Sequence, residues 1–171
     1  MRFAVALLSL FGLVLAGCQT ASNRVPLEQT ADIRVGEVSV VLADGAQIPA
    51  DLRDVVAPKV KAAMERHLSP RLKGSTPVRV EVKVKSITIA SEVETVLIGG
   101  VHAMRADVTF IDPRTKAVLF ASNSFSNQVG GGGGVGGLVI DRAVLSAPID
   151  RIADGYAFQY AELLRPSEPR S

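Results

Sequence analysis

The sequence has very few of the residues that form disulfides, stack on rings or coordinate metals. Its 171 residues include one cysteine, no tryptophan, two tyrosines and two histidines. One thiol cannot form a disulfide within the chain, and a metal site built on cysteine needs several thiolates, so both are excluded. The scarcity of rings argues against the stacking platforms that bind single-stranded nucleic acids or sugars, and it predicts an aliphatic core.

The sequence also lacks a large excess of positive or negative charge. Lys and Arg number 19 and Asp and Glu number 17, which gives a formal net charge of +2. A nearly neutral chain has no electrostatic footprint for nucleic acid, so no nucleic-acid partner is predicted. With 47% hydrophobic and 21% charged residues, the composition is typical of one ordinary globular domain.

The longest hydrophobic run lies at the N-terminus. Met1 and Arg2 precede an apolar run over residues 3–15 that only Ser9 and Gly12 interrupt. A helix of this length spans about 20 Å, which is short of the roughly 30 Å hydrocarbon core of a bilayer. The pattern therefore predicts a signal peptide, residues 1–17, that is removed on export.

The run ends in small residues and the lone cysteine, as Leu15-Ala16-Gly17-Cys18. This tetrapeptide resembles the lipobox of bacterial lipoproteins. The resemblance implies that diacylglycerol alkylates the Cys18 thiol, that the chain is cut between Gly17 and Cys18, and that the acyl chains anchor the mature protein. Gln19, where some lipoproteins have aspartate, implies an outer-membrane address with the domain facing the periplasm. Each buried methylene contributes about 0.8 kcal/mol, so such an anchor needs no inserted protein segment.

Three segments are predicted after the signal peptide. Residues 18–32 are polar and aperiodic, which predicts a lipidated tether with a reach of about 20 Å. Residues 33–164 carry the hydrophobic periodicities of a single folded domain. Residues 165–171 contain two prolines and no apolar residue, which predicts a disordered tail.

The first half of the domain is predicted to contain two strands and a helix. Alternating apolar residues predict a strand over 38–42. Apolar residues spaced by three and four predict an amphipathic helix over 49–68, which Pro58 is expected to kink or restart. Residues 78–85 alternate valine with charged residues, which predicts a strand with one buried face and a bulge at residues 85–86.

The second half is predicted to contain two strands and a helix. A strand over 101–110 is followed by a tight turn at 112–116, a strand over 117–121 and a helix over 139–164 that Pro148 breaks near its start. The order predicts an α+β fold, an antiparallel or mixed sheet of about four strands with two helices packed on one face. Together with the lipobox, this order resembles small uncharacterised bacterial lipoproteins of the domain-of-unknown-function type. The resemblance implies a mostly non-catalytic role in envelope assembly or transport.

No arrangement of reactive side chains indicates an enzyme. His67 and His102 have no second ligand at metal-binding spacing, so both are expected to be partly buried packing residues, and neither metal nor cofactor is predicted. Glu92, Glu94 and Asp107 are too scattered to be paired as acid and base. The chain is therefore predicted not to be an enzyme.

A serine-rich and glycine-rich segment is the remaining candidate for binding. Ser122, Ser124 and Ser126 alternate as at the edge of a strand and are expected to be solvated. The glycine run that follows lacks the Gly-Lys-Ser or Gly-Lys-Thr of a phosphate-binding loop, and Asp141 supplies its own negative charge to the next helix. It is therefore interpreted as a flexible connector. A loop that contacts a partner or ligand is the alternative, formed by Gly130, Gly131, Gly132, Gly133, Gly134, Gly136 and Gly137.

Three functional hypotheses follow from these patterns. The leading one is a membrane-anchored envelope lipoprotein that acts as a non-enzymatic protein-binding or assembly factor, through exposed sheet edges or the loop over 127–137. The alternative is a carrier or sensor that holds a lipid or small apolar ligand between helices and sheet. The third, an envelope hydrolase, would depend on His67 or His102.

Overall fold

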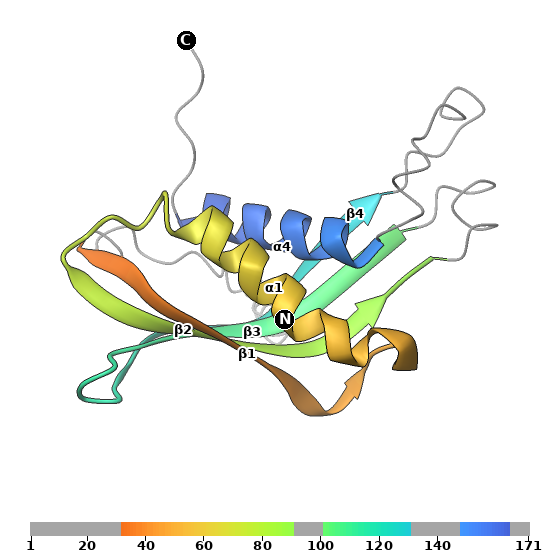
Figure 1. Cartoon of the computed structure of the whole chain (residues 1–171), viewed down its shortest axis with the longest axis horizontal. Coiled ribbons are helices and arrows are strands. Elements are labelled where there is room, and N and C mark those ends of the chain that lie inside the picture. Colours follow the sequence, from red (N-terminus) through yellow and green to blue (C-terminus); the bar gives the residue numbers. More distant parts are fainter. Residues whose placement is uncertain (1–31, 91–100, 131–147, 165–171) are drawn as a thin grey trace, which may run out of the picture.

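The computed structural model of the protein describes residues 32–90, 101–130 and 148–164. Figure 1 shows its strands as one curved layer, with both long helices on the same face of that layer. In chain order the elements are β1 (Ile33–Gln47), the single turn η2 (Ala50–Leu52), α1 (Arg53–Leu68), β2 (Thr76–Thr88), β3 (Val101–Ile111), β4 (Val118–Gly130) and α4 (Pro148–Leu164).

The four strands form one mixed sheet in the order β1-β2-β3-β4. β1 and β2 are parallel, whereas β2 with β3 and β3 with β4 are antiparallel. Parallel neighbours cannot be joined by a tight turn, and α1 supplies the crossover between β1 and β2. The predicted α+β class, with a mixed sheet and two helices on one face, is confirmed.

The sheet and the helices bury a shared core. The valines of β2 alternate as predicted, and all four point inward at 0% exposure: Val78, Val80, Val82 and Val84. α1 packs on β1 and on α4, and α4 packs on β3 and β4. Each fully buried aliphatic side chain contributes about 1.5–3 kcal/mol relative to exposure, so this face determines which side of the sheet the helices cover.

Aromatic side chains dominate one part of this core. Most buried residues are aliphatic, as predicted, but the three largest are Tyr156, Tyr160 and Phe110. Phe125 of β4 lies edge-on to both tyrosines of α4, with ring centroids 5.2 Å apart in each case. Residues four apart share one face of a helix, so both tyrosines reach the sheet together. The prediction of an aliphatic core is thus wrong for the part under α4, because the few rings of the chain are concentrated there.

Pro58 lies inside α1, which runs as one helix from Arg53 to Leu68. Of the two outcomes expected at this proline, a restart of the helix is therefore wrong. Proline removes one backbone donor, whose acceptor four residues earlier would be Asp54 in the first turn. Val56 before the proline and Val60 after it are both fully buried on the same face, and their burial favours one continuous helix.

The predicted strand features around β3 are confirmed. Its inward side consists of His102, Met104, Ala106, Val108 and Phe110, all buried. The register between β2 and β3 shifts between Val84 and Ser86, which is the bulge expected at residues 85–86.

The turn between β3 and β4 depends on Asp112. Its Oδ1 atom accepts hydrogen bonds from the backbone N–H groups of Arg114 at 2.8 Å and Thr115 at 3.3 Å. Lys116 completes the turn at a φ of 62°, in the left-handed region. The predicted tight turn is therefore present, but the strand after it is much longer than residues 117–121, because β4 runs from Val118 to Gly130.

The connection from α1 to β2 passes across the beginning of β1. The N–H of Gly74 donates to the carbonyl of Ile33 at 2.8 Å, and the N–H of Thr76 donates to the carbonyl of Asp32 at 2.9 Å. Successive carbonyls of a strand point to opposite sides, so the connection bonds to both edges of β1. A Cβ atom on Gly74 would lie 2.0 Å from the carbonyl carbon of Asp32, so only glycine fits this crossing.

Candidate functional site

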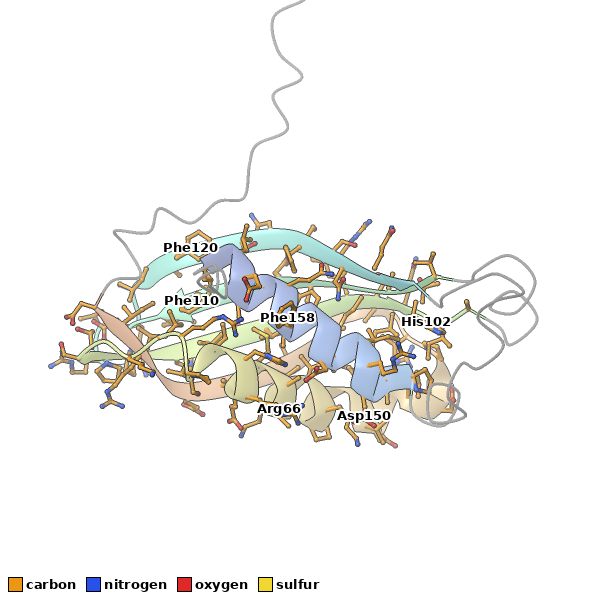
Figure 2. The ribbon with its side chains drawn as sticks, turned by 90° about the horizontal axis from the view of Figure 1, so that it is seen from above. Arg66, His102, Phe110, Phe120, Asp150 and Phe158 are labelled. Carbon is orange, nitrogen blue, oxygen red and sulfur yellow. The ribbon has the colours of Figure 1, made fainter. Side chains whose placement is uncertain are left out.

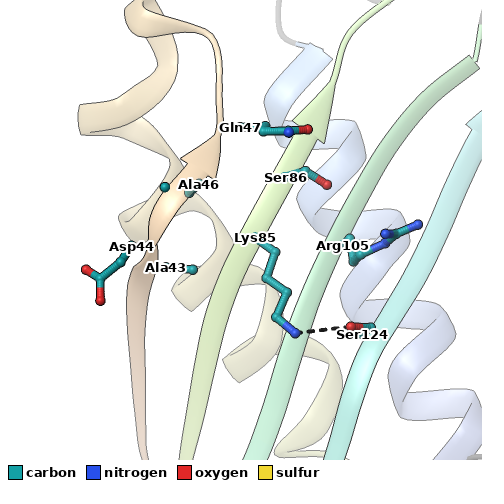
Figure 3. Close-up of a pocket in the computed structure, with 9 residues that line it drawn as sticks. Ala43, Asp44, Ala46, Gln47, Lys85, Ser86, Arg105 and Ser124 are labelled. Carbon is teal, nitrogen blue, oxygen red and sulfur yellow. Dashed lines mark hydrogen bonds between the residues drawn. The ribbon is translucent and has the colours of Figure 1, made fainter.

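The helix-free face of the sheet carries a groove of about 350 Å³. Figure 3 shows it in front of the sheet, with the helices behind. The groove forms where three strands lose regular pairing: β1 shifts register between Leu42 and Gln47, β2 bulges at Lys85, and β4 bulges at Ser124. Its lining is polar and charged, with small residues from β1: Ala43, Asp44, Gly45, Ala46, Gln47, Lys85, Ser86, Arg105 and Ser124.

A row of three side chains joins the strands beside this groove. Lys85 Nζ lies 2.7 Å from Asp107 Oδ1 and donates to Ser124 Oγ at 3.1 Å. The same Asp107 oxygen accepts the backbone N–H of Ser124 at 2.6 Å, and Ser124 has a φ of 54°. Partial burial alone would raise the pKa of Asp107, but the hydrogen bonds from Lys85 and Ser124 outweigh it and hold that pKa below its ordinary value. The carboxylate therefore fixes the bulges of β2 and β4 relative to each other.

The charges of this groove suit polar contact better than catalysis. The Lys85 ammonium is neutralised by Asp107, so it is poorly suited to act as a base. Within the described ranges, the Arg105 guanidinium has no hydrogen bond or ion pair, which leaves it as a cation facing solvent in the groove. One such cation, with Asp44 at the rim, provides little preference for an anionic ligand.

The outer edge of β4 is the most exposed apolar feature of the sheet. Among the described strands only β3 pairs with β4, so the backbone groups on its other side have no strand partner. Its thirteen residues include no Lys, Arg, Asp, Glu or Pro. Val118 is 59% exposed and Leu119 is 44% exposed. The sequence prediction ended this strand at Ala121; the signal that could have extended it is the uncharged stretch that continues well past that residue.

The predicted solvation of the serines is wrong for one of the three. Ser122 is 2% exposed and faces the helices, whereas Ser124 and Ser126 are exposed. The bulge in β4 causes the difference: Ser122 pairs with Val108 while Phe125 pairs with Ala106, so an extra residue reverses the facing of the serines beyond it.

A second groove, of about 400 Å³, lies between the two helices and is lined by Arg66, Asp150, Arg151, Asp154 and Gly155. Both of its aspartates are paired across the helices. Lys59 on α1 lies 2.7 Å from Asp150 on α4, and both Arg66 and His67 contact Asp154, at 2.7 and 2.8 Å. Figure 2 shows Arg66 and Asp150 on this side of the helix layer. These pairs join α1 to α4 at the surface, where each contributes at most about 1 kcal/mol.

His67 is part of this contact between the two helices. Its ring packs edge-on against Phe158, with centroids 5.7 Å apart, and Arg71 lies over the same phenyl ring at 5.5 Å. Arg71 also pairs with Glu162. In the described part of the chain, no hydroxyl or thiol is hydrogen-bonded to either histidine ring. The expectation that His67 is a partly buried packing residue is confirmed.

His102 is buried on the inner face of β3, also as expected. It is 8% exposed, and its Nδ1 atom accepts the backbone N–H of Ala90 at 3.2 Å. Burial, with a smaller contribution from the positive charge of Arg151, lowers the pKa of His102. The ring is therefore a neutral acceptor at neutral pH.

The other sequence candidates lie mostly outside the described residues. Cys18, Gly17, Glu92 and Glu94 are among them, as are the glycines from 131 onward; Gly130 is the last residue of β4. Among the residues described, no three His, Cys, Asp or Glu side chains are grouped as metal ligands. No helix within the same ranges has both the length and the apolar content to cross a bilayer.

Comparison with known proteins finds similarity only to solved structures. No family model matches the chain, and no curated protein matches its sequence. The PelC dodecamer from Paraburkholderia phytofirmans is similar over 78% of this chain and 88% of its own, with 10% identity and a TM-score of 0.49. A point variant of that protein gives 10% identity and a TM-score of 0.48, over 80% of this chain and 92% of its own.

A provisionally assigned lipoprotein from Caulobacter crescentus CB15 is also similar. It covers 81% of this chain and 91% of its own, with 11% identity and a TM-score of 0.39. All three TM-scores lie below 0.5, so the function of this chain is argued from its own residues.

Proposed function

We propose that the chain is the precursor of an outer-membrane lipoprotein, anchored through Cys18 and facing the periplasm, whose domain binds another envelope protein without catalysing a reaction. The observation that carries the proposal is the outer edge of β4. An unpaired strand edge offers a row of backbone donors and acceptors to an added strand, and soluble proteins usually block such edges with charge or proline. β4 has neither over thirteen residues.

The bulge at Ser124 divides this edge into two parts. Its N–H is occupied by Asp107, so a partner strand cannot pair continuously across it. The stretch from Val118 to Ser122 lies before this bulge, has a second register shift of its own at Leu119, and carries the exposed Val118 and Leu119 side chains. Backbone pairing along this stretch would supply affinity, and the two exposed aliphatic side chains would supply apolar contact.

The carrier alternative receives less support from the described core. It requires space for an apolar ligand between helices and sheet. Large side chains occupy that space, with Tyr156, Tyr160, Met64 and Phe110 each no more than 1% exposed. The two grooves described above open to solvent and are lined by polar and charged residues, which suits an apolar ligand poorly.

Photocrosslinking in intact cells tests the protein-binding function. A benzophenone amino acid is placed at Leu119 on β4 or at Val41 on β1; the two native side chains are 44% and 43% exposed, at opposite edges of one sheet. We expect irradiation to give a protein adduct at position 119 and little at position 41. Equal labelling at both positions would contradict a binding role for the β4 edge.

The lipid anchor is tested separately, because it depends on the sulfur atom of Cys18 alone. Cys18→Ser removes the only thiol of the chain, so we expect no fatty acid on the product, no cleavage before residue 18 and loss from the outer-membrane fraction. Mass spectrometry of the N-terminal peptide and membrane fractionation measure these results. Normal processing and retention of the serine variant would exclude the lipoprotein assignment.

A further inference from the structure

We propose that the partner bound by the β4 edge is a second copy of this chain, paired antiparallel along residues 118–122 about a two-fold axis. The inference rests on the proposed function, since it names the occupant of the same edge. The two four-stranded sheets would thereby continue as one sheet of eight strands. A two-fold pairing is closed, so it needs no second surface on the molecule.

Charge favours this pairing at β4. In a two-fold antiparallel pair, each residue faces a residue of the same strand in the other copy, so charged edges bring like charges close together. Between Val118 and Gly130 there is no charged residue, and this repulsion is absent. Self-pairing of residues 118–122 places the axis at Phe120, and Lys116 lies beyond the paired stretch.

The chain segment beside the beginning of β1 disfavours that edge as the contact. The β1 edge carries Arg34, Glu37 and Asp44, and Lys73 bridges to Arg34 on its outer side. An added strand would have to displace the Lys73 connection, whose crossing is fixed by the tightly packed Gly74. The second copy is therefore expected at β4 and not at β1.

Apolar side chains at β4 lie where a second copy would cover them. Val118 and Leu119 are exposed, and Phe120 and Phe125 are partly buried against the edge of the core. Phe120 packs on Phe110 with ring centroids 6.0 Å apart, so it extends the core toward the edge. Figure 2 shows both rings at the β4 side of the molecule, beyond the C-terminal half of α4. Pairing would remove the outer side of these groups from water.

The expected attachment strengthens a weak pairing. A net charge of +2 for the whole chain causes little repulsion between copies. Tethering all copies by a short segment to one membrane restricts them to a thin layer, which raises their effective concentration. A five-residue strand contact that is weak in dilute solution can therefore be populated at the membrane.

Disulfide scanning of the full chain in intact cells tests the register directly. The chain has one native cysteine, which the proposed lipidation blocks, so each introduced thiol is the only one free. Leu119→Cys, Ala121→Cys and Asn123→Cys sample β4, and Val41→Cys on β1 is the matched control. A disulfide needs Cα atoms about 4.4–6.8 Å apart, so only directly facing positions are joined.

The pattern of products identifies the arrangement. With the axis at Phe120, Leu119 of one copy faces Ala121 of the other. We therefore expect the strongest product of twice the chain mass when Leu119→Cys and Ala121→Cys are expressed together, at least fivefold stronger than for Val41→Cys. When two cysteine variants are expressed together, mixed dimers should form best for pairs whose residue numbers have one constant sum, which is the signature of antiparallel self-pairing. A dimer signal at β4 no stronger than at Val41→Cys would overturn the proposal, as would a preference for β4 thiols to join β1 thiols.

This result is distinguishable from failure of the proposed function. If benzophenone at position 119 labels a different envelope protein and the disulfide scan shows no register, the protein-binding role stands and self-pairing is wrong. If neither experiment gives a product specific to β4, both are wrong. A specific dimer at β4 supports both.

Discussion

The two edges of the sheet are opposites in chemistry. β1 carries Arg34, Glu37 and Asp44, and the Lys73–Gly74 connection lies along its first residues. β4 carries no charge, and none of the described strands covers it. A sheet whose edges were both protected would indicate a solitary domain, and one with both edges open would tend to aggregate. The sheet therefore has one edge that is bridged at its beginning and one edge that no described strand covers.

Each edge also has a carboxylate that holds its geometry. Asp32 accepts hydrogen bonds from the N–H and Oγ of Ser75, at 3.0 and 2.9 Å, and from Oγ1 of Thr76 at 3.1 Å, which holds the crossing over β1. Asp107 holds the bulge of β4. The covered edge and the open edge can therefore be perturbed separately.

The largest effect is expected from closing the space at Gly74. In Gly74→Ala the new methyl meets backbone atoms of Asp32 and Ile33 at 2.0–2.4 Å, and backbone cannot yield as a side chain does. We expect a loss of about 3 kcal/mol in the free energy of unfolding, measured with denaturant. Gly45→Ala is the control: its φ is 70° in open space, so only about 1 kcal/mol of backbone strain is expected. Equal losses in both variants would mean that the crossing is not tightly packed.

The next effect concerns the contacts of Asp107 with Lys85 and Ser124 at the β4 bulge. Asp107→Ala removes the acceptor of Lys85 and of the Ser124 N–H, and we expect a loss of about 2 kcal/mol, because hydrogen bonds to charged groups contribute about 1.5–3 kcal/mol. Asp150→Ala removes a pair whose side chains are 45% and 46% exposed, and should lose only about 0.5 kcal/mol. Thermal or denaturant unfolding measures both. A smaller loss for Asp107→Ala than for Asp150→Ala would contradict the proposed role of Asp107 in holding the two bulges together.

A smaller effect is expected when a charged side chain, of the kind that β1 carries, is added to the β4 edge. Leu119→Lys places two like charges near the proposed axis, so association should weaken by roughly fivefold to tenfold, about 1–1.4 kcal/mol. Val41→Lys adds the same charge at β1 and should leave association unchanged. The stability of either variant should change by less than about 0.5 kcal/mol. Disulfide yield from Phe120→Cys, the position on the axis, measures the association in each background, and equal yields would show that the β4 edge is not the contact.

The smallest effect expected is the contribution of Asp32, beside the beginning of β1, to the loss of stability in acid. Hydrogen bonds from the Ser75 backbone, the Ser75 hydroxyl and Thr76 lower the pKa of Asp32 below its ordinary 3.8. A carboxylate with a lowered pKa stabilises the fold above its unfolded pKa, and this contribution is lost as the pH falls through the folded pKa. Asp32→Asn should therefore unfold with a weaker pH dependence than the wild type below pH 3.8. Denaturant midpoints at several acidic pH values measure this. If the midpoint depends on pH equally in the variant and the wild type, Asp32 does not contribute to the acid response.

Local patterns in the sequence predicted most of the fold. The alternating valines of β2, the inward side of β3 and the bulge at residues 85–86 all depend on the spacing of neighbouring residues, which the chain shows directly. The two histidines were also assigned correctly as packing residues, since each continues the buried face of its own element. Cleavage and lipidation at Cys18 depend on a contiguous tetrapeptide and stay predictions.

The features on which the proposed binding depends are formed by residues far apart in the chain. The extent of β4, the burial of Ser122 and the aromatic packing under α4 required the pairing of β3 with β4 and the docking of α4 on both. The passage of Gly74 across β1 likewise joins segments about forty residues apart, without a periodic signal.

The sequence alone determined the main elements, their order and the buried sides of β2 and β3, because hydrophobic burial follows a local period of two or 3.6 residues. Only the tertiary structure decided which strands lie at the two edges of the sheet, and that one of these edges is bridged at its beginning. That choice depends on the competition among long-range pairings and on the path of one connection, and neither leaves a pattern within a single segment.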